Sequence, residues 1–513
     1  MDASSTDVLI IGAGPTGLVL ALWLTRLGVR VRIVDKAAEP GTTSRALGVQ
    51  ARTLELYSQV GLAAPVVERG RQILAVNLWV AGRRAAHAVL GEIGAGLSPF
   101  PYLLIFPQDE HERLLIDRLA NAGVHVERRV ELLGFEDRSD RVLARLKRPD
   151  GDGETCEAAY IAGCDGAHST VRETLQIGFP GGTYEHLFYV ADVEARGETL
   201  NGELHVALDR TDFLAVFPLK EDGRARLVGT VRDDAERRHE NLSWNDVSKR
   251  VIEWIRIDVR RVNWFSTYRV HHRVADRFRQ GRAFVLGDAA HIHSPVGAQG
   301  MNTGIGDAVN LAWKLAAVLR GRANASILDS YEPERIAFAR RLVATTDQAF
   351  TGVTSSGAFA LAIRLHIVPL VLPPLFALQP VRRFMFRTVS QTMVNYRGSS
   401  LSEGQAGAVH GGDRLPWVKE ADAIGTDNFS PLTSLDWQVH VYGEAAPEIR
   451  AVCEERRLSL RIFQWRRAMS RAGLRRHAAY LVRPDGYVAL ADADGRAAAI
   501  ASYLDTRNMK PLG

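Results

Sequence analysis

Glycine and aspartate residues in three distant segments have the types and spacing needed to hold a large dinucleotide. The first segment places Gly12, Gly14 and Gly17 between two apolar runs, and Asp35 ends the second run. In such a fingerprint the first glycine forms a tight turn, the second admits a pyrophosphate to a helix N-terminus, and the third lets helix and strand pack closely. Asp35, about 20 residues further on, is placed to accept hydrogen bonds from the adenosine ribose. This segment predicts a βαβ nucleotide site.

Two further acidic residues follow apolar runs that are typical of buried strands. Asp165 follows the run YIAGC, and Asp288 follows the run AFVLG. The carboxyl ends of parallel strands are where α/β sheets bind ligands, and Asp288 can bond a ribityl hydroxyl there. A glycine-rich loop then runs to Gly304, and its backbone N–H groups at Met301 and Asn302, backed by a helix dipole, suit the anionic edge of a flavin ring. Together the three segments indicate FAD.

Helices and strands of an α/β protein must position these residues. Gln108 lies at the entrance of an amphipathic helix that begins near Asp109 and stops at Gly123, where a new strand follows. From this entrance the side-chain amide of Gln108 could reach a cofactor. A second amphipathic helix is predicted over 307–319, after the glycine-rich loop.

Outside this α/β pattern the arrangement of apolar and polar residues along the chain changes twice. Between Gly181 and about Asp276, apolar runs such as LHVALD and FLAVFPL alternate with turn residues, which predicts the antiparallel strands of a substrate domain. The run ILAVNLWVAGRRAAHAVL, over 73–90, is a similar interruption and is expected to pair with them. After about Ser400 we expect a small, separate α/β domain whose role is packing or dimerisation.

Composition favours a small-molecule partner. The 513 residues are too many for one core and predict roughly two or three packed domains. The net charge is +5, and the 64 basic and 59 acidic residues are mixed along the chain, which argues against nucleic acid as a partner. Cys156, Cys164 and Cys453 have neither metal-ligand spacing nor a CxxC pair, so we expect no metal site and a reducing compartment. The first apolar run leaves no room for a signal peptide, which favours the cytoplasm.

One apolar stretch, over 357–378, raises the question of a membrane. Arg364, His366, Pro369, Pro373 and Pro374 interrupt it. A transmembrane helix needs about 20 consecutive apolar residues, so no transmembrane segment is predicted. A buried helix, a kinked turn and another helix, in the core or at an oligomer interface, are expected, with peripheral membrane contact as the alternative.

The chain resembles the single-component flavoprotein aromatic hydroxylases, nearest to the phenol, pentachlorophenol and polyketide hydroxylases. The segments that carry the resemblance are GAGPTG with Asp35, SRALGVQARTLEL, CDGAHSTVR, GDAAHIHSPVGAQGMNTGIGDAVNLAWKL and RPDGYVAL, and they span nearly the whole chain. The resemblance implies an α/β protein with a Rossmann-like FAD-binding domain, an antiparallel β-sheet substrate domain and a C-terminal thioredoxin-like domain. The expected bounds are 1–75 with 101–180 and 278–395, 76–100 with 181–277, and 400–513 respectively.

Roles of particular residues follow from the same resemblance. Arg45 and Gln108 would contact FAD, Asp165 would lie where flavin and nicotinamide meet, and Asp288 would bind the ribityl chain. The reaction face would be formed by Pro295, Gly297, Ala298, Gly300, Met301 and Asn302. The sequence departs from the family at Ala298, where a second glycine is usual, and at Gly306, where glutamine is common. Either change could alter the mobility of the loop.

The chemistry that the resemblance implies is aromatic hydroxylation. NADPH or NADH reduces FAD, O2 adds at the flavin C4a carbon, and the hydroperoxide transfers its distal oxygen to a phenolic or polyketide-type ring. A Baeyer–Villiger or epoxidising monooxygenase and a non-catalytic flavin-holding partner are the alternatives. The sequence lacks the WxWxIP segment of flavin halogenases.

Substrate contacts are less well defined by the sequence. Tyr102, Phe217 and Tyr268 are candidates for lining an aromatic pocket. His291, His293, His271 and His272 are candidates for a base that deprotonates a phenol, and none of them stands out. The substrate and its regiochemistry, the choice between NADH and NADPH, and the oligomeric state, with a homodimer as one option, are left open.

Overall fold

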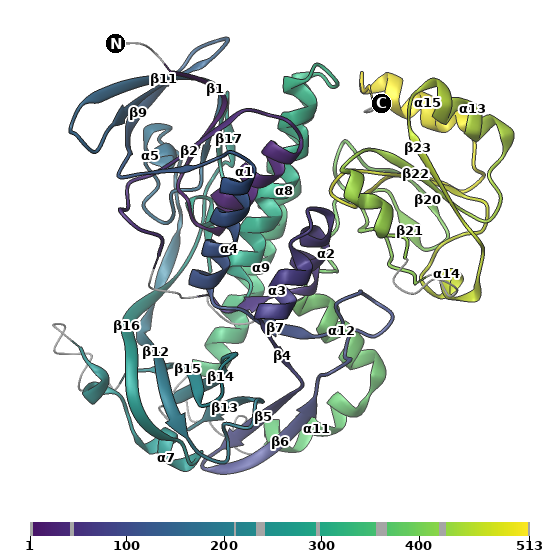
Figure 1. Cartoon of the computed structure of the whole chain (residues 1–513). Coiled ribbons are helices and arrows are strands. Elements are labelled where there is room, and N and C mark those ends of the chain that lie inside the picture. The colour runs from purple at the N-terminus through teal and green to yellow at the C-terminus, as the bar shows by residue number, and fades with distance from the viewer. Residues whose placement is uncertain are drawn as a thin grey trace.

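The computed structural model describes residues 4–41, 46–209, 212–231, 242–293, 298–354, 367–419 and 427–510. Four sheets organise the described part of the chain: a mainly parallel sheet with helices, a large antiparallel sheet below it, a three-stranded sheet, and a six-stranded sheet near the C-terminus (Figure 1). This arrangement is a mixed α/β fold.

A mainly parallel sheet carries the expected nucleotide segments. β1 pairs in parallel with β11 and β2, and β18 pairs in parallel with β11. The order is β17 (Arg279–Gln280), β18 (Ala283–Val285), β11 (Gly153–Gly163), β1 (Ser4–Ile11), β2 (Val31–Asp35) and β8 (Val126–Arg128), with β10 (Val142–Lys147) and β9 (Glu131–Asp137) added beside β11. The carboxyl ends of β1, β11 and β18 therefore lie side by side, which brings the residues after them together.

Helices cover this sheet. α1 contacts both α4 and α8 (Figure 1). The helices of this part are α1 (Pro15–Arg26), α2 (Ala51–Gln59), α3 (Ala63–Arg69), α4 (Gln108–Asn121), α5 (Thr170–Thr174), α8 (Gly300–Leu319) and α9 (Tyr331–Thr354), with the 3₁₀ turns η2 (Gly287–Ala289) and η3 (Ala325–Ser330). Pro15 starts α1, because its fixed φ suits a first helical position and its missing N–H would find no partner there. Leu18 to Leu24 are all buried, so α1 is held in the core on every side.

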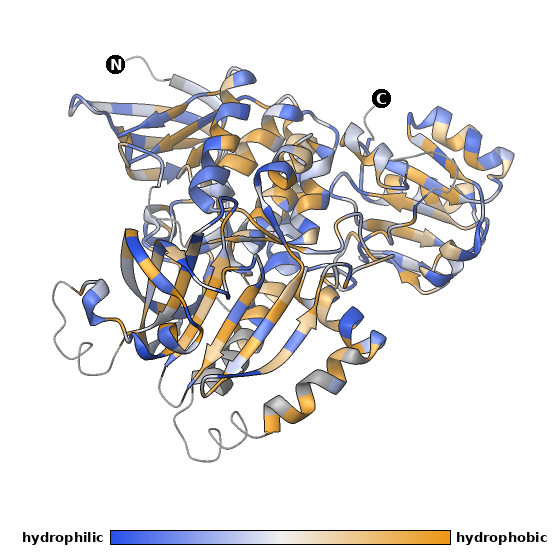
Figure 2. Cartoon of the chain, turned by 60° about the horizontal axis from the view of Figure 1, so that its bottom comes forward, coloured by the Kyte–Doolittle hydropathy of each residue, from blue (hydrophilic) through white to orange (hydrophobic). Residues whose placement is uncertain are grey.

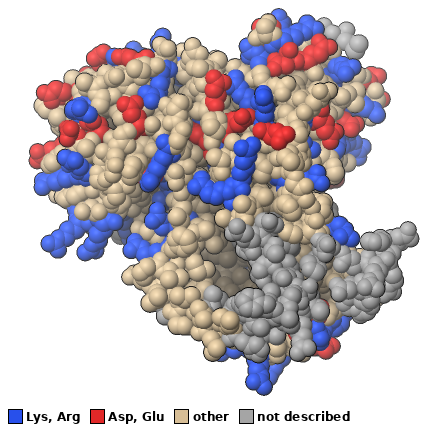
Figure 3. Space-filling model, turned by 180° about the vertical axis from the view of Figure 1, so that it is seen from behind, with Lys and Arg blue, Asp and Glu red and all other residues tan. Residues whose placement is uncertain are grey.

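The second sheet has eight strands and is antiparallel except where β13 pairs with β5. Its order is β19 (His291–Ile292), β16 (Asp258–Val274), β12 (Gly181–Arg196), β15 (Arg224–Thr230), β14 (Phe213–Pro218), β13 (Leu204–Leu208), β5 (Ala75–Val80) and β6 (Arg83–Val89). One face packs on α7 (Arg250–Trp254) and the 3₁₀ turn η1 (Trp244–Asp246) in a separate core. The other face packs on a three-stranded sheet of β3 (Gly48–Val49), β7 (Leu103–Ile105) and β4 (Arg71–Ile73). Seen from behind, the lower half of the molecule, where the eight-stranded sheet lies, has a hollow with uncharged residues along one side (Figure 3).

The C-terminal sheet stands apart, at the right of Figure 1. Its order is β21 (Val409–His410), β20 (Glu403–Ala406), β25 (Val488–Asp492), β24 (Ala479–Val482), β22 (Gln438–Tyr442) and β23 (Ser459–Phe463). The accompanying helices are α13 (Pro447–Glu455), α14 (Arg467–Arg471), α15 (Ala497–Thr506) and the 3₁₀ turn η5 (Ser430–Ser434). β22, α13 and β23 form a parallel βαβ unit, and β24 runs antiparallel to both β22 and β25.

A buried ionic network ties this C-terminal part to α8 and α9. Arg483 donates to both carboxylate oxygens of Glu334, at 2.8 and 3.0 Å, and also to Asp485. Lys314 on α8 donates to the same Glu334 at 2.8 Å. Because each of these charges is buried and paired, the loss of one partner would leave another charge uncompensated.

The expected buried helices over 357–378 are not found in the described part of that stretch. Residues 355–366 lie outside the described residues, and α11 (Val368–Ala377) with α12 (Gln379–Val389) follows. Leu370 is 76% exposed and Leu378 is 53% exposed. α11 lies along the edge strand β6 (Figure 1), so only part of its surface can be covered. Among the described residues, no helix is both long enough and apolar enough to cross a membrane.

Candidate functional site

The three glycines of the first segment have three different environments. Gly12 has φ +101°, and a Cβ there would lie 2.3 Å from the carbonyl oxygen of Cys164. A Cβ at Gly17 would lie 2.0 Å from the carbonyl oxygen of Gly12. Gly14, in contrast, has nothing within 4 Å of such a Cβ, and it precedes α1, whose N-terminus has no side-chain cap. The open space thus lies in front of unsatisfied N–H groups and the positive end of a helix dipole, which suits a pyrophosphate.

Asp35 is fixed beside this turn. Its Oδ2 accepts from the N–H of Ala13 at 2.7 Å, and its Oδ1 accepts from the N–H of Ala37 at 2.8 Å. Arg128 approaches the same carboxylate, with Nη1 3.7 Å from Oδ2. Each carboxylate oxygen has a second lone pair, so the carboxylate retains the capacity to accept from ribose hydroxyls.

Asp165 lies just beyond β11, next to the Gly12 turn. Its Oδ2 accepts a 3.3 Å hydrogen bond from the N–H of Val171. Its Oδ1 is buried and has no hydrogen-bond partner among the described residues. Burial raises the pKa of the Asp165 carboxyl above its usual value, against hydrogen bonds from Ser169 and the backbone that lower it. A buried acceptor without a partner is rare in folded proteins, which suits a site that a bound group completes.

Asp288 lies on the exposed side of η2, whereas Gly287 and Ala289 on either side are buried. The turn itself is held by Asp307 of α8, whose Oδ2 accepts from the N–H of Gly287 at 3.0 Å and from Nε2 of His291 at 2.7 Å. Arg335 donates to the other oxygen of Asp307 at 2.6 Å. Burial would raise the pKa of Asp307, but Arg335 and His291 outweigh it and lower that pKa. His291 is therefore a buried partner of Asp307 and not an accessible base.

The glycine-rich loop ends earlier than the sequence predicted. α8 begins at Gly300, so Gly304 and Gly306 lie inside the helix and the loop does not run to Gly304. A Cβ at Gly304 would lie 2.3 Å from Oγ1 of Thr16, so the glycine lets α8 pack closely on the start of α1. The first hydrogen bond of α8 runs from the N–H of Thr303 to Gln299. The N–H groups of Gly300, Met301 and Asn302 precede it and have no partner within the helix.

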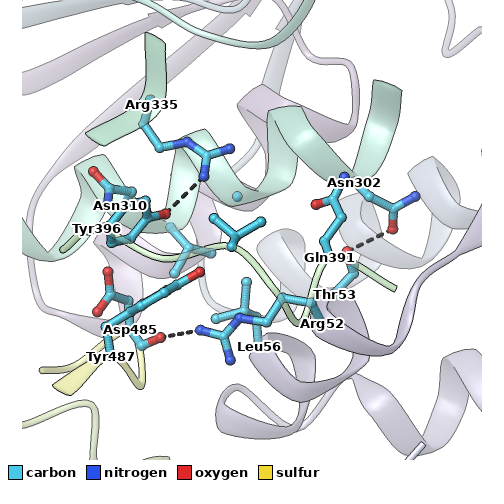
Figure 4. A pocket seen from close by; sticks show the side chains of 13 residues that line it. Arg52, Thr53, Leu56, Asn302, Asn310, Arg335, Gln391, Tyr396, Asp485 and Tyr487 are labelled. Atoms are coloured by element: carbon cyan, nitrogen blue, oxygen red, sulfur yellow. Dashed lines mark hydrogen bonds between the residues drawn. The ribbon is translucent and has the colours of Figure 1, made fainter. Parts of the chain in front are cut away.

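The side chain of Asn302 is fully used in holding this helix end. Its Oδ1 accepts from the N–H of Gln50 at 2.9 Å and from Oγ1 of Thr53 at 2.7 Å (Figure 4). Its Nδ2 donates to the carbonyl oxygens of Gly48 and Ala298, at 2.9 and 2.8 Å. Asn302 therefore offers a ligand only its backbone N–H, whereas its side chain clamps α8 to β3 and α2.

Ala298 has a left-handed backbone, with φ +53°. Residues with a Cβ rarely adopt this conformation, and glycine does so without strain. This is the position at which the sequence departs from the paired glycine of the resembling family. An alanine at this position therefore adopts its backbone conformation at the cost of local strain.

The remaining cofactor candidates are placed less completely. Gln108 begins α4, where its Oε1 accepts from the N–H of Ala46 at 3.3 Å and its Nε2 donates to Glu112 at 2.8 Å. Its amide thus fixes the chain just after Arg45. Arg45, Pro295 and Gly297 lie outside the described residues.

Arg172 joins two of the segments, which the sequence did not predict. Its Nη1 donates to the carbonyl oxygen of Ala289 at 3.0 Å, and its Nη2 donates to that of Ala167 at 2.9 Å. The guanidinium also lies 4.0 Å from the ring centroid of Phe179. The segment after β11 and the segment after β18 are thereby held together by one side chain.

Two of the three aromatic substrate candidates share a face of the eight-stranded sheet. The strand registers put Phe217 and Tyr268 on the face that is turned toward the three-stranded sheet, and Tyr268 lies 6.1 Å from Phe188 between ring centroids. Tyr102 is elsewhere, at the start of β7, where it packs edge-on against Phe100.

The same face carries a charged pair that the sequence gave no reason to expect. Arg226 is 1% exposed, and its Nε and Nη2 donate to the two oxygens of Asp192 at 2.5 and 2.7 Å. The guanidinium lies 5.8 Å from the ring centroid of Trp264. Arg226 and Asp192 face each other only when β12 and β15 pair, 34 residues apart.

The other histidine candidates lie near the edge of this sheet. His271 Nδ1 and the hydroxyl of Thr183 share a 2.7 Å hydrogen bond. Burial and the neighbouring Arg273 lower the pKa of His271. His272 packs on Tyr184, 4.8 Å between ring centroids, and His293 lies 3.8 Å from where a Cβ of Gly300 would be. No one of them is singled out as a base.

A separate small pocket, with a cavity volume of about 20 Å³, is lined in part by Asn302 (Figure 4). Its walls come from α2, α8, α9 and the C-terminal part, and they are bonded to one another. Arg335 donates to the hydroxyl of Tyr396 at 2.9 Å, and Arg52 donates to the carbonyl oxygen of Asp485 at 2.6 Å. The pocket lies at a polar junction between α2, α8 and α9, the segment 391–396 and the C-terminal part.

Comparison with known proteins identifies the relatives of this arrangement. Residues 5–346 match the family model described as FAD binding domain. The chain is 36% identical to 6-methylpretetramide 4-monooxygenase of Streptomyces rimosus over 427 residues, which are 80% of this chain and 74% of that protein. It is 32% identical to a flavin-dependent monooxygenase of Mycobacteroides abscessus over 511 residues, 95% of this chain and 98% of that one. Among solved structures, the anhydrotetracycline hydroxylase OxyS of Streptomyces rimosus superposes with a TM-score of 0.79 at 28% identity, covering 98% of this chain and 99% of that one.

Proposed function

Because this chain belongs to the family of FAD-dependent aromatic monooxygenases, we propose that it hydroxylates a phenolic, polyketide-type small molecule with NAD(P)H and O2. The chain is a flavin monooxygenase, as its relatives are. The observation that carries the proposal for its site is the convergence of the Gly12 turn, Asp165 and the N-terminus of α8 on one edge of the parallel sheet.

The residues present fit FAD. The open space before Gly14 suits the pyrophosphate. Asp35 is placed for the adenosine ribose, and Asp288 is placed for the ribityl chain. The N–H groups of Met301 and Asn302, which have no partner within the helix, would stabilise negative charge on the ring edge. When bound, FAD supplies the hydride acceptance and the oxygen activation that no side chain of the protein can provide.

Asp165 is proposed to lie where nicotinamide and flavin meet. Its buried, unpartnered Oδ1 supports this role, because an acceptor kept ready in a dry site can orient an incoming group.

The proposed use of NAD(P)H is also our reason for proposing that the reaction takes place in the cytoplasm. Pro295 and Gly297, outside the described residues, remain proposed members of the reaction face, with Ala298 and Gly300.

The substrate is proposed to lie against the sheet face that carries Phe217 and Tyr268. Aromatic side chains there offer planar apolar contact, and the buried pair of Arg226 with Asp192 offers a fixed polar group beside Trp264. The names of the tetracycline-pathway relatives support a fused polyketide ring as the substrate class. Tyr102 stays a weaker candidate, because it packs on Phe100 outside this face.

We also propose that the C-terminal part, 400–513, is a thioredoxin-like domain without a redox pair. The parallel unit β22–α13–β23, followed by the antiparallel hairpin β24–β25 and α15, supports this assignment. The other two domains are proposed with the bounds expected from the sequence, and the pairing of β5 and β6 with β13 supports placing 76–100 in the substrate domain.

The experiment that tests the function is a panel of ring compounds added to the purified, FAD-loaded protein. NAD(P)H oxidation should rise sharply with a fitting phenolic polyketide and should remain slow without one. Asp288→Ala should weaken FAD retention by about 1.5–3 kcal/mol, the range for hydrogen bonds to charged groups. A protein that takes up no FAD, or that oxidises NAD(P)H at one rate with every compound, would overturn the proposal.

A further inference from the structure

An exposed apolar surface follows α11, α12 and the edge strand β6. Most of the large apolar side chains that are exposed in the described part of the chain belong to it. We call this surface the apolar flank; its members are Leu74, Val89, Ile367, Leu370, Val371, Leu375, Leu378 and Phe384. Exposed apolar side chains that gather in this way mark an interaction site. Single apolar residues scattered over a surface do not.

Arginines border the apolar flank. Arg83 and Arg84 begin β6, and Arg383 and Arg387 lie on α12; all four are exposed. The sequences of β6, α11 and α12 contain no Asp or Glu, and the exposed Glu92, three residues after β6, is the next acid along that part of the chain. Figure 2 shows the apolar run of α11 at the lower edge of the molecule, with hydrophilic residues where α12 follows.

This combination of surfaces fits an anionic lipid bilayer. An amphipathic segment with Leu and Phe on one side and Arg beside them lies in the membrane interface, with its apolar face at the headgroup boundary. Arginines beside it are attracted by the negative surface potential of anionic lipids. α11 has 10 residues, which is too short to cross a bilayer but sufficient to lie in its surface.

A second copy of the chain fits this surface less well. A two-fold contact would set the flank against itself, so that the arginine border of one copy faces the arginine border of the other. No acid on β6, α11 or α12 would compensate these charges. Partial burial, followed by the nearby Arg414 and Arg383, lowers the pKa of Arg387, and Asp413 opposes the shift.

We propose that the apolar flank is a membrane-docking surface that seats the protein on anionic lipid, with α11 in the interfacial layer. A monooxygenase held there would meet aromatic compounds dissolved in the bilayer. This last consequence rests on the proposed function, whereas the docking itself does not.

Vesicle flotation of the full-length, FAD-loaded protein tests the proposal. Vesicles of phosphatidylcholine alone are compared with vesicles that also contain phosphatidylglycerol, at low and at high salt. We expect binding to the anionic vesicles that weakens with salt, and a loss of roughly tenfold or more in the double variant Arg383→Gln/Arg387→Gln. The double variant Leu370→Gln/Leu375→Gln should no longer float. Leu133→Gln, at a 55% exposed leucine on β9, is the matched control and should float like the wild type.

Several results would overturn the proposal. They are no flotation of the wild type with anionic vesicles, unchanged flotation of either double variant, or equal loss in Leu133→Gln. Light scattering of the same samples measures the oligomeric state and so tests whether a second copy covers the flank. A dimer that becomes a monomer in Leu370→Gln/Leu375→Gln would assign the flank to a second copy. Should that variant melt early, the arginine variant decides, because its side chains are exposed. FAD content and NAD(P)H oxidation, measured in parallel, report on the proposed function independently of docking.

Discussion

Arg172 donates a 3.0 Å hydrogen bond to the carbonyl oxygen of Ala289, across 117 residues of sequence. This contact fixes the segment that carries Asp165 against the turn that carries Asp288. Two proposed ends of the flavin site are thus held at a constant separation by a buried guanidinium, which carries a second bond to Ala167.

The first prediction concerns this contact. Arg172→Lys keeps the charge but cannot reach both carbonyl oxygens with a planar fork, so it should lower stability by about 2 kcal/mol and weaken FAD binding. Urea unfolding and flavin fluorescence titration measure the two effects. Arg30→Lys, at an exposed ion pair with Asp7, is the control and should change neither. If both variants behave alike, Arg172 does not hold the two segments together.

A second prediction concerns the strained residue of the loop. Ala298 has φ +53°, which costs a residue with a Cβ roughly 1–2 kcal/mol. Ala298→Gly should therefore raise the free energy of unfolding by about 0.5–1 kcal/mol. This net value is smaller than the strain that is relieved, because glycine also gives the unfolded chain more conformational entropy. Ala501→Gly in the interior of α15 should have the opposite sign, because glycine disfavours a helix. An Ala298→Gly protein no more stable than the wild type would show that this position carries no strain.

Much of the cofactor framework could be predicted from local sequence. The spacing of Gly12, Gly14 and Gly17 determines a turn, an open helix N-terminus and a close helix contact, all within one βαβ unit. The partners of Asn302 could not be predicted in this way, because Gln50 and Thr53 lie about 250 residues away and meet it only in the folded chain.

Two differences have specific physical causes. The start of α8 was predicted too late, because glycine has low helix propensity, and here the close packing of Gly304 on Thr16 outweighs that propensity. The apolar stretch of α11 was predicted to lie in the core or at an oligomer interface, and its exposure argues against the core only. Hydrophobicity alone cannot distinguish a core helix from an apolar helix at the surface. The exposure of α11 follows from its place beside the edge strand β6.

The third prediction separates chemistry from folding at Asp165. Asp165→Ala should slow flavin reduction by NAD(P)H roughly tenfold to a hundredfold, because an orienting acceptor is lost. Asp165→Asn keeps an oxygen for the N–H of Val171 and serves as the control for structure. Stopped-flow absorbance measures the rate with FAD saturating in all three proteins. If Asp165→Ala reduces flavin at the wild-type rate, Asp165 has only a structural role at the end of its strand.

Acid stability gives a fourth prediction. Burial lowers the pKa of His111 from 6.5 to about 3, and its Nε2 shares a 2.6 Å hydrogen bond with the hydroxyl of Tyr57. Between these two pKa values His111 is protonated in the unfolded chain and neutral in the folded chain. The free energy of unfolding should therefore fall as the pH decreases from about 6.5 toward 3. His111 should contribute up to about 1.4 kcal/mol per pH unit in this range.

Urea unfolding at several pH values measures this contribution. His111→Gln keeps a polar partner for Tyr57 but does not titrate, so its stability should depend less steeply on pH below 6.5 than that of the wild type. Parallel curves for the two proteins would mean that His111 has the same pKa in the folded and the unfolded chain.

The central claim is that the site formed by the Gly12 turn, Asp165 and the N-terminus of α8 makes this protein a ring hydroxylase. The most direct measurement is the mass of the product formed from a phenolic polyketide by the FAD-loaded protein with NAD(P)H under ¹⁸O2. The account predicts a ring product that is heavier by one labelled oxygen atom, and roughly tenfold or more less of it from Asp165→Ala at matched time. NAD(P)H consumed with a product that contains no labelled oxygen, or with the label inserted beside a carbonyl carbon as an ester, would contradict aromatic hydroxylation.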